Sequence, residues 1–507
     1  MTAGVTATRF AAGFGQPAKG AIMTTTAEPA TGARTPRRAH RAWMWMAGVA
    51  GVAIMAGLLF GYDQGVISGV LSFLGPQFHL SSTMQEVVTS WVTLGALFGA
   101  LLAGGVADRF GRKPALLSAG VLFSIGAVTQ AAAGATEVLV AGRFVIGLGV
   151  GVASVAAPLY VAEIARSDVR GRMVSTYQLA ITIGILAAYI VDAVLTPAQS
   201  ELATSSNWRW MLGGALVPGV LLIVLMFVMP ESPRWLMKAG RRDQARAVTI
   251  KVVGAAGVDE RLDRIEADVR AEAKDRATWG EVFSHRVRPM LVVGVGLALF
   301  QQVTGINAVI YYADEIFARA GFTTAAEQTD ATLLAVGCVN VLATLVAVAF
   351  VDRFGRKPLL LAGLIGMFTS LTALGFGFLA LDEAPKGAGP SLTGIVALVC
   401  LVVYIASFAF SLGPIVWTVI SEIFPSRIRG RGISIATAAN WAAAFVVSQT
   451  FLSLLDGIGA PATFWLFAAF CGAAFLWIWR VVPETKGKRL EDIQAAFAEH
   501  AASRAGA

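Results

Sequence analysis

Two ionisable residues, Asp63 and Arg143, lie inside long apolar segments of this chain. A charged side chain deep in a membrane costs several kcal/mol, about 2.5 to 3.5 on insertion scales, so each needs a partner and a reason. No other intramembrane charge of opposite sign is an evident partner, and we therefore expect the two residues to pair. A carboxyl group that is charged beside an arginine and neutral when separated from it can couple a proton to a conformational change. The alternatives are a fixed buried ion pair, or an Asp63 that is hydrated near the outer face.

Side-chain amides offer a second kind of chemistry, beginning with QQVTGIN at residues 301–307. Amides donate and accept hydrogen bonds without carrying charge, which suits the recognition of neutral hydroxyl groups. Later apolar segments add Asn340 and Asn440. In GPIVW, residues 413–417, a glycine and a proline are expected to break a helix and to place Trp417 beside the same cavity. An uncharged polyol stacked on an aromatic ring fits this set, whereas each amide alone is equally typical of a contact between helices.

The other reactive residue types form no catalytic or metal-binding pattern. The three cysteines lie far apart in apolar segments without CxxC spacing, and the four histidines fall outside the apolar segments. Gly147, Gly149 and Gly151 lie in an apolar segment that follows no strand, so they indicate close helix packing and not a phosphate-binding loop. The sequence therefore predicts a protein that is not an enzyme and that holds no metal and no cofactor.

The composition indicates which elements must position these residues. Hydrophobic residues make up 56% of the 507 residues and charged residues 14%, below the roughly 25% of soluble domains. Twelve apolar runs approach the ~20 residues that cross a bilayer core, and they lack the alternation of barrel strands. We expect an all-α membrane protein in a lipid bilayer, with transmembrane helices that start near residues 44, 87, 114, 137, 173, 210, 288, 331, 358, 392, 432 and 461.

The basic residues indicate how the chain crosses the membrane. Of the 40 lysines and arginines, all but four fall in the termini and in alternate loops on the side of the N-terminus; the exceptions are Arg143, Arg209, Arg319 and Lys386. This asymmetry predicts that both termini face the cytoplasm and that the number of spans is even. The net charge of +8 therefore reports topology and not a nucleic-acid partner.

The two halves of the chain repeat each other. DRFGRK occurs at residues 108–113 and again at 352–357, and a glutamate followed by Arg-Gly-Arg also recurs. A duplicated six-helix unit is associated with secondary transporters, whose substrate site lies at mid-membrane between the halves. Apolar positions at helical spacing among many charges predict a solvated helical linker between the halves. The expected parts are a disordered cytoplasmic tail at 1–43, an N-terminal half at 44–229, the linker at 230–287, a C-terminal half at 288–481 and a cytoplasmic tail at 482–507.

Charged residues in the repeated loops predict a gate at the cytoplasmic ends of the helices. They can form charge-assisted links between helices, and breaking such links would open an inward path. Anchoring of the topology is the alternative interpretation. The charged residues of this gate are Arg109, Glu163, Arg170, Arg353, Glu422 and Arg429, and we also assign a gating role to the tyrosines that follow the amide segment, Tyr311 and Tyr312.

With these motifs the chain resembles the sugar porter family of the major facilitator superfamily, over roughly residues 44 to 490. The motifs are GGVADRFGRK, PLYVAEIA, PESPRWL, QQVTGIN, GPIVW, SEIFPSRIRG and PETKG. The resemblance implies that Asp63 matches the carboxylate of proton-coupled members and Arg143 its partner. It also implies sugar contacts for Phe60, Gln178, Gln301, Gln302, Asn307, Asn340, Trp417 and Asn440. Two positions depart from the family pattern: Ile185 stands where some xylose symporters have glutamine, and Val348 replaces a glycine expected before Asp352.

The resemblance implies a symporter that imports glucose, or a related hexose or pentose, together with a proton. We expect it to work by alternating access, as a monomer in the plasma membrane. A facilitative carrier of sugars or of inositol-type polyols is the first alternative, and a sugar sensor with little transport is the second. The short segment after Val482 argues against the sensor, since sensors of this kind carry long signalling tails.

Overall fold

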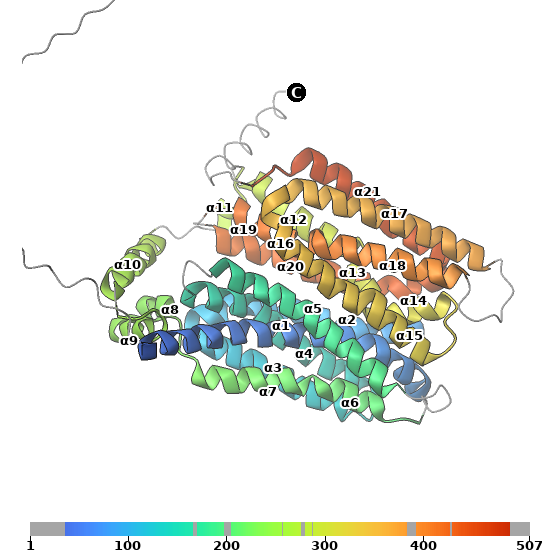
Figure 1. The fold of residues 1–507 in the computed structure, drawn as a ribbon, viewed down its shortest axis with the longest axis horizontal. Helices are drawn as coiled ribbons and strands as arrows, with labels where there is room; N and C mark the ends of the chain where they lie inside the picture. Colours follow the sequence, from blue (N-terminus) through green and yellow to red (C-terminus); the bar gives the residue numbers. More distant parts are fainter. Residues whose placement is uncertain are drawn as a thin grey trace, which may run out of the picture.

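Helices make up the regular structure of the described residues in this computed structural model (Figure 1). The described residues are 36–165, 170–196, 204–255, 257–274, 279–285, 287–382, 392–425 and 428–486. Among them, twelve helices are long and apolar enough to cross a membrane, which confirms the predicted fold class and number of spans. Helices suit such segments because they bond their own backbone where lipid offers no partner.

The N-terminal half contains six of the spans, drawn from blue to green in Figure 1. Its first helix already begins at Pro36, before the expected start at residue 44, and a proline suits the first position of a helix because an N–H there would have no helical partner. Residues 1–35 of the expected disordered tail lie outside the described residues. The helices are α1 (Pro36–Phe78), α2 (Ser82–Phe110), α3 (Arg112–Ala131), α4 (Thr136–Ile164), α5 (Arg170–Leu195), and α6 (Asn207–Gly214) with α7 (Leu216–Val228), which share one span.

The C-terminal half contains the other six spans, and two of them are broken near their middle. Gly305, with φ 97°, separates the first two helices of this half, and a Cβ there would lie 2.9 Å from the ring of Phe467. The break expected at residues 413–417 lies just before them, at Ser411, since Pro414 has no N–H to bond to the Phe410 carbonyl and the motif itself lies at the start of the next helix. The helices are α12 (Arg288–Val303), α13 (Ile306–Tyr311), α14 (Ala313–Arg319), α15 (Ala325–Thr332), the π-helix η2 (Leu333–Cys338), α16 (Val339–Phe354), α17 (Arg356–Asp382), α18 (Leu392–Phe410), α19 (Leu412–Ile423), α20 (Arg429–Gly457) and α21 (Gly459–Val481).

Short helices join the two halves at one end of the bundle, on the left of Figure 1. They are α8 (Pro233–Lys238), α9 (Arg242–Val253), α10 (Val258–Lys274) and α11 (Trp279–Val282), within the linker expected at 230–287. Arg246 pairs with Asp259 between α9 and α10 at 2.9 Å, an exposed contact of modest value. We call this end of the bundle, where α3 begins, the linker end, and the opposite end, where α1 and α20 finish, the far end.

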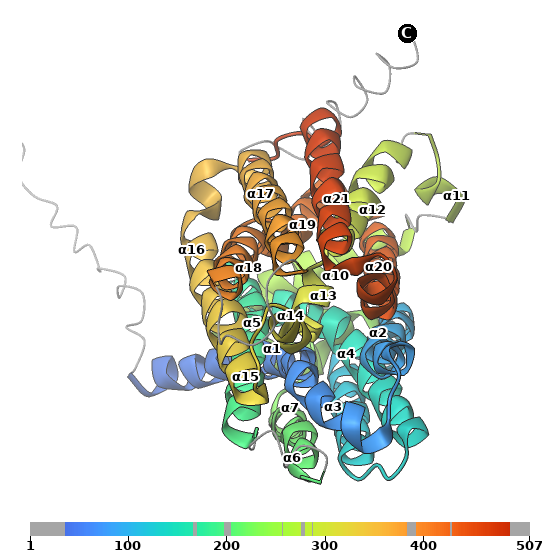
Figure 2. The same cartoon turned by 90° about the vertical axis from the view of Figure 1, so that its right-hand side faces the viewer.

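Small residues allow the spans of the N-terminal half to approach closely. A Cβ on Gly61 of α1 would lie 1.9 Å from the carbonyl oxygen of Ile181 in α5, and one on Gly147 of α4 would lie 2.1 Å from a carbonyl of α2. Gly149 and Gly151 meet backbone carbonyls of α3 and α2 in the same way, which confirms the packing role expected for these glycines. Close packing of α1, α2 and α4 brings their polar side chains within bonding distance, and Figure 2 shows the two halves side by side.

Candidate transport site

Asp63 and Arg143 form the ion pair that their isolation in apolar segments predicts. Arg143 Nη1 of α4 lies 2.7 Å from Asp63 Oδ1 of α1, and each residue is about 1% exposed. The same guanidinium donates from Nε to the carbonyl of Val88 in α2, at 3.2 Å. Burial of an ion pair is costly unless its geometry is good, and here the guanidinium also bonds to backbone carbonyls of α2. Arg143 therefore connects α4 to α1 through Asp63 and to α2 through the Val88 carbonyl.

Gln64, the residue after Asp63, reaches from α1 into the other half. Its Nε2 donates to Asn307 Oδ1 and to the hydroxyl of Tyr311, each at 3.3 Å. We did not predict this contact from the sequence, although a polar residue beside the buried acid in FGYDQGVISG was a signal for it. Through Gln64, the helix that carries the acid touches the expected substrate residues directly.

The expected amides of the C-terminal half bond to one another in a buried chain. Asn307 Nδ2 donates to Gln302 Oε1 at 2.9 Å, and Gln302 Nε2 donates to Asn440 Oδ1 at 3.3 Å. Asn440 Nδ2 donates to Gln301 Oε1 at 2.8 Å, and Gln301 Nε2 reaches the carbonyl of Leu412 at the break before α19, also at 2.8 Å. Each of these amides is at most 7% exposed. Because every amide both donates and accepts, hydroxyl groups can replace these mutual bonds without leaving a buried polar atom unpaired.

Aromatic rings lie beside the amides, one from each half. The ring of Phe60 in α1 lies 5.4 Å from that of Trp441 in α20, between centroids, so the two halves meet through it. Trp441 follows Asn440 in the sequence and was not among the predicted residues. Trp417 on α19 and Gln178 on α5 are half-buried, and Asn340 on α16 is buried. The structure thus gathers Phe60 with the amides near the contact between the halves; for the last three, the placement leaves the sugar contact a prediction.

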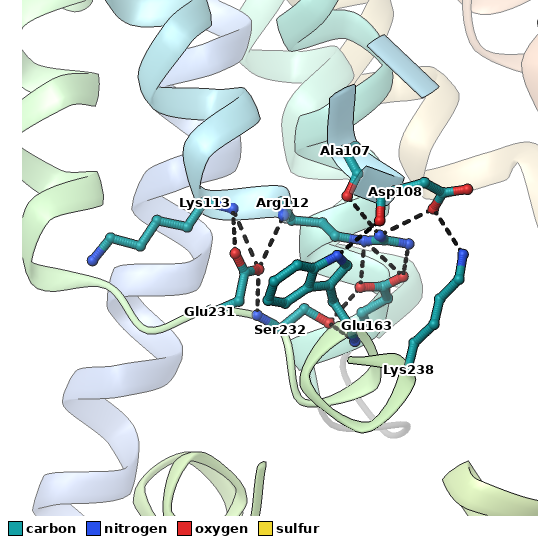
Figure 3. Close-up of polar contacts among 9 residues, drawn as sticks. Ala107, Asp108, Arg112, Lys113, Glu163, Glu231, Ser232 and Lys238 are labelled. Carbon is teal, nitrogen blue, oxygen red and sulfur yellow. Dashed lines mark hydrogen bonds and ion pairs between the residues drawn. The ribbon is translucent and has the colours of Figure 1, made fainter. Parts of the chain in front are cut away.

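At the linker end, Glu163 of α4 is bonded by Arg112, the first residue of α3 (Figure 3). Arg112 Nη2 lies 2.8 Å and Nε 3.0 Å from the two carboxylate oxygens, so the pair is bidentate. Arg112 Nη1 also donates to the carbonyl of Ala107 and to Asp108 of α2, at 2.9 and 3.2 Å. Ser232, before α8, donates its hydroxyl to Glu163 as well. One guanidinium and one carboxylate therefore join α2, α3, α4 and the linker, with charge-assisted bonds.

Glu231 caps the first turn of α3 from the linker. It accepts hydrogen bonds from the backbone N–H groups of Arg112 and Lys113, at 3.0 and 3.1 Å, where a helix has no partners of its own (Figure 3). Gly111 has φ 113°, a conformation that residues with a side chain rarely adopt, and a Cβ there would also lie 2.2 Å from this carboxylate. Burial raises the pKa of the Glu231 carboxyl, although the bonds from the N–H groups of Ser232, Lys113 and Arg112 act in the opposite direction.

The C-terminal half repeats this network with different residues. Arg356 Nη2, at the start of α17, lies 3.0 Å from Glu422, and the Thr485 hydroxyl donates to the same carboxylate at 2.6 Å. Glu484 accepts from the N–H groups of Arg356 and Lys357, each at 3.0 Å. For the Glu484 carboxyl, burial raises the pKa, but hydrogen bonds from backbone N–H groups outweigh it and the net pKa is lowered. The repeated signal is Pro-Glu-Ser in PESPRWL and Pro-Glu-Thr in PETKG, motifs whose contacts we did not derive from the sequence.

Of the other charged residues assigned to the gate, three make different contacts. Arg109 and Arg353 are exposed, and each stacks over the phenylalanine that follows it. The second arginine of each DRFGRK motif, Arg112 or Arg356, is the one that pairs with a glutamate. A glycine with φ of 113° or 92° between the two arginines of each motif ends one helix and turns the next residue inward. Arg429 donates to the carbonyl of Phe424 at 3.2 Å. Arg170 begins α5, and its side chain lies outside the described part of the structure.

At the far end, polar bonds hold the two halves together. Glu86 of α2 accepts from the N–H and hydroxyl of Ser453 in α20, at 2.6 and 2.7 Å, and Ser90 donates to Gln449 at 2.6 Å. The tyrosines assigned to the gate lie in the same region: Gln64 donates to Tyr311 across the halves, and Tyr312 donates to the carbonyl of Ser448 at 2.8 Å. The molecule is therefore closed between its halves at the far end.

Comparisons with known proteins agree with this architecture. A family profile described as "Sugar (and other) transporter" matches residues 49–497. The arabinose-proton symporter of Escherichia coli (strain K12) is 39% identical over 479 residues, 93% of this chain and 97% of the relative. A D-xylose transporter of Levilactobacillus brevis is 40% identical over 449 residues, 87% of this chain and 94% of the relative. Among solved structures, the inward open conformation of the xylose transporter XylE from E. coli has a TM-score of 0.76 at 34% identity, covering 89% of this chain and 99% of that chain.

Proposed function

The chain belongs to the sugar (and other) transporter family, and we propose that it imports a monosaccharide together with a proton by alternating access. Similar proteins carry the names arabinose-proton symporter and galactose-proton symporter. The observation that carries the proposal is the buried Asp63–Arg143 pair, because a carboxylate with one cationic partner can take up a proton when that partner leaves it. Glucose or a related hexose or pentose is the proposed substrate, since neutral amides and aromatic rings suit a polyol.

Proton binding and sugar binding meet on α1. Protonation neutralises Asp63 and removes its attraction for Arg143, which keeps its bond to the Val88 carbonyl. The next residue, Gln64, bonds to Asn307, one of the amides proposed to take sugar hydroxyls. A sugar that bonds to Asn307 in place of Gln64 therefore removes a bond between α1 and the C-terminal half. Sugar binding can in this way change the position of α1, the helix that carries the proton site Asp63.

The two ends of the bundle serve as alternating gates in this proposal. The linker end faces the cytoplasm, together with both termini, because the basic loops and the linker gather there. The protein acts as a monomer in the plasma membrane, with the substrate passing between its two halves. Separating the far-end contacts of Glu86 and Ser90 opens the path from outside, while the Glu163 and Glu422 networks hold the linker-end helices of each half together.

One proton per sugar is energetically sufficient for import. A charge moved across about 100 mV supplies about 2.3 kcal/mol. At about 1.4 kcal/mol per tenfold change, this sustains roughly 50-fold accumulation of the sugar. A membrane potential alone can therefore drive uptake against a substantial gradient.

Replacing Asp63 with asparagine tests the proposal. In proteoliposomes with an imposed pH gradient, Asp63→Asn should lose accumulation of labelled sugar and keep counterflow exchange, because the binding amides are untouched while the proton site is gone. Asp330→Asn, which changes an exposed acid on α15, should accumulate sugar like the unchanged protein. Accumulation by the Asp63→Asn variant would show that another group carries the proton, and a facilitative carrier would give no sugar-dependent proton uptake in either form.

The identity of the sugar can be settled with the same vesicles. A panel of unlabelled hexoses, pentoses and inositol, competed against one labelled substrate, ranks the sugars by occupancy of one site. Inhibition by inositol above all sugars would favour the polyol carrier. Binding without uptake of any competing sugar would favour the sensor.

A further inference from the structure

A second pair of buried acids lies nearer to the far end than Asp63, beside the next turns of α1. Asp192 stands on α5 in the N-terminal half and Asp314 on α14 in the C-terminal half, and they are 1% and 3% exposed. Neither belongs to the transport site described above. Two carboxyl groups from opposite halves thus occupy the buried contact that closes this end of the molecule.

Neighbouring residues of α1 hold the two acids in one place. The N–H of Gly69 donates to Asp192 Oδ2 at 3.3 Å, and a Cβ on Gly69 would lie 2.7 Å from that carboxyl carbon. The Ser68 hydroxyl accepts from the N–H of Asp314 at 3.0 Å. On the other side, the Thr332 hydroxyl of α15 donates to Asp314 Oδ1 at 2.5 Å. Each carboxyl is therefore fixed through one oxygen.

The second oxygen of each carboxyl has no partner. Asp192 Oδ1 and Asp314 Oδ2 are buried without a hydrogen bond to any described residue. Among the described residues, the titratable groups that interact electrostatically with Asp192 are Asp314, Tyr62 of α1 and Tyr189 of α5, and none of these is a cation. Two carboxylates that share a buried site without a cation resist being ionised together, because burial and mutual repulsion both oppose it.

We propose that Asp192 and Asp314 form a second proton-binding site, in which the pair binds one proton more tightly when the far end is closed than when it is open. The two unpartnered oxygens are the places where that proton binds. When the halves separate, each carboxyl meets water and the proton leaves to the far side. Since the proton arrives from and returns to the same side, this site sets the balance between open and closed forms and adds no proton to the transport cycle. The proposal is independent of the coupling role of Asp63.

The surroundings fit reversible protonation from the far side. A cavity of about 200 Å³ lies beside Ser68, and Gln85 and Glu315 also line it. Burial raises the pKa of the Asp314 carboxyl to about 6, even though its hydrogen bonds with Thr332 and Ser68 act to lower it. An aspartate in water titrates near about 3.9. The closed form therefore binds the proton more tightly than the open form, so acid favours closure, and this preference is lost as the pH rises through the value of the closed form.

The expected size of the effect follows from these two values. The site has a pKa of about 6 in the closed form and about 3.9 in the open form. The ratio of closed to open molecules therefore rises about tenfold from pH 7.5 to pH 5. Spin labels on Gly134 and Gly457, exposed far-end positions in opposite halves, report this ratio as a distance distribution in the full-length protein. The three native cysteines are first replaced by serine, and Asp63→Asn is present throughout so that its titration does not contribute.

The proposal predicts a tenfold pH shift in this parent protein and none in the Asp192→Asn/Asp314→Asn double variant. The matched control, Asp330→Asn, should keep the shift of the parent. A closed-to-open ratio that does not change with pH in the parent protein would overturn the proposal, and this result needs no further variant. A pH shift that remains in the double variant would also overturn it. An equal shift caused by Na⁺ or Ca²⁺ at constant pH would overturn it in favour of a cation site. Since sugar accumulation is not the readout, these outcomes are separate from a failure of coupling through Asp63.

Discussion

Arg112→Gln is expected to destabilise the protein far more than Arg109→Gln, although both change an arginine of the same motif. The side chains of Arg112 and Glu163 are 7% and 6% exposed, and bonds of 2.8 and 3.0 Å join them. Removing one partner of a buried pair leaves the other charge without compensation, which costs about 3 to 5 kcal/mol. Arg109 is exposed, so its replacement should change the free energy of unfolding by no more than about 0.5 kcal/mol.

Denaturant titration of the full-length protein in detergent measures these free energies. The Arg112→Gln/Glu163→Gln double variant is the decisive comparison, because two neutral amides can bond to each other where two charges stood. It should lose less stability than the sum of the two single variants. Equal losses for Arg112→Gln and Arg109→Gln would refute the assignment of the buried arginine, and strict additivity in the double variant would refute the pairing itself.

Two further predictions concern packing and pH. Gly61→Ala should cost about 1 to 3 kcal/mol, because its Cβ would lie 1.9 Å from the Ile181 carbonyl oxygen, whereas Gly104→Ala, with no atom within 4 Å, should not destabilise the protein; equal unfolding temperatures would contradict this. The lowered pKa of Glu484 means that its charged form stabilises the fold above its usual value of 4.5, and this contribution disappears as the pH falls through the folded-state value. Glu484→Gln should flatten the acid side of the stability profile, and an unchanged profile would refute the capping role.

Residue type and spacing were enough to predict the membrane fold and its central ion pair. Asp63 and Arg143 had no other evident partner in lipid, so their pairing followed from cost alone. The break in the span that contains residues 413–417 followed from the missing N–H of a proline. Gln301, Gln302 and Asn440 were predicted as amides of one cavity, and the structure shows them bonded together. In each case one physical requirement admitted few solutions.

Choices between similar residues could not be made in this way. Arg109 and Arg112 have the same chemistry and lie three positions apart, and the turn at Gly111, with φ 113°, decides which one faces Glu163. Sequence patterns report such a turn poorly, because any glycine permits several conformations. The acid pair was missed for another reason: Asp192 and Asp314 stand in different halves, and their meeting depends on how α5 and α14 both pack against α1.

The two halves have equivalent contacts at the linker end and different polar residues in the middle of the bundle. Arg112 with Glu163 and Arg356 with Glu422 are equivalent pairs, as the duplication of the motifs requires. In the middle of the bundle the N-terminal half supplies the buried charges, and the C-terminal half supplies the amides. Gln64 joins them across the contact. The proton site lies in the N-terminal half and the amides lie in the C-terminal half. Binding of a proton and binding of a neutral solute can therefore both affect the same movement of one half relative to the other.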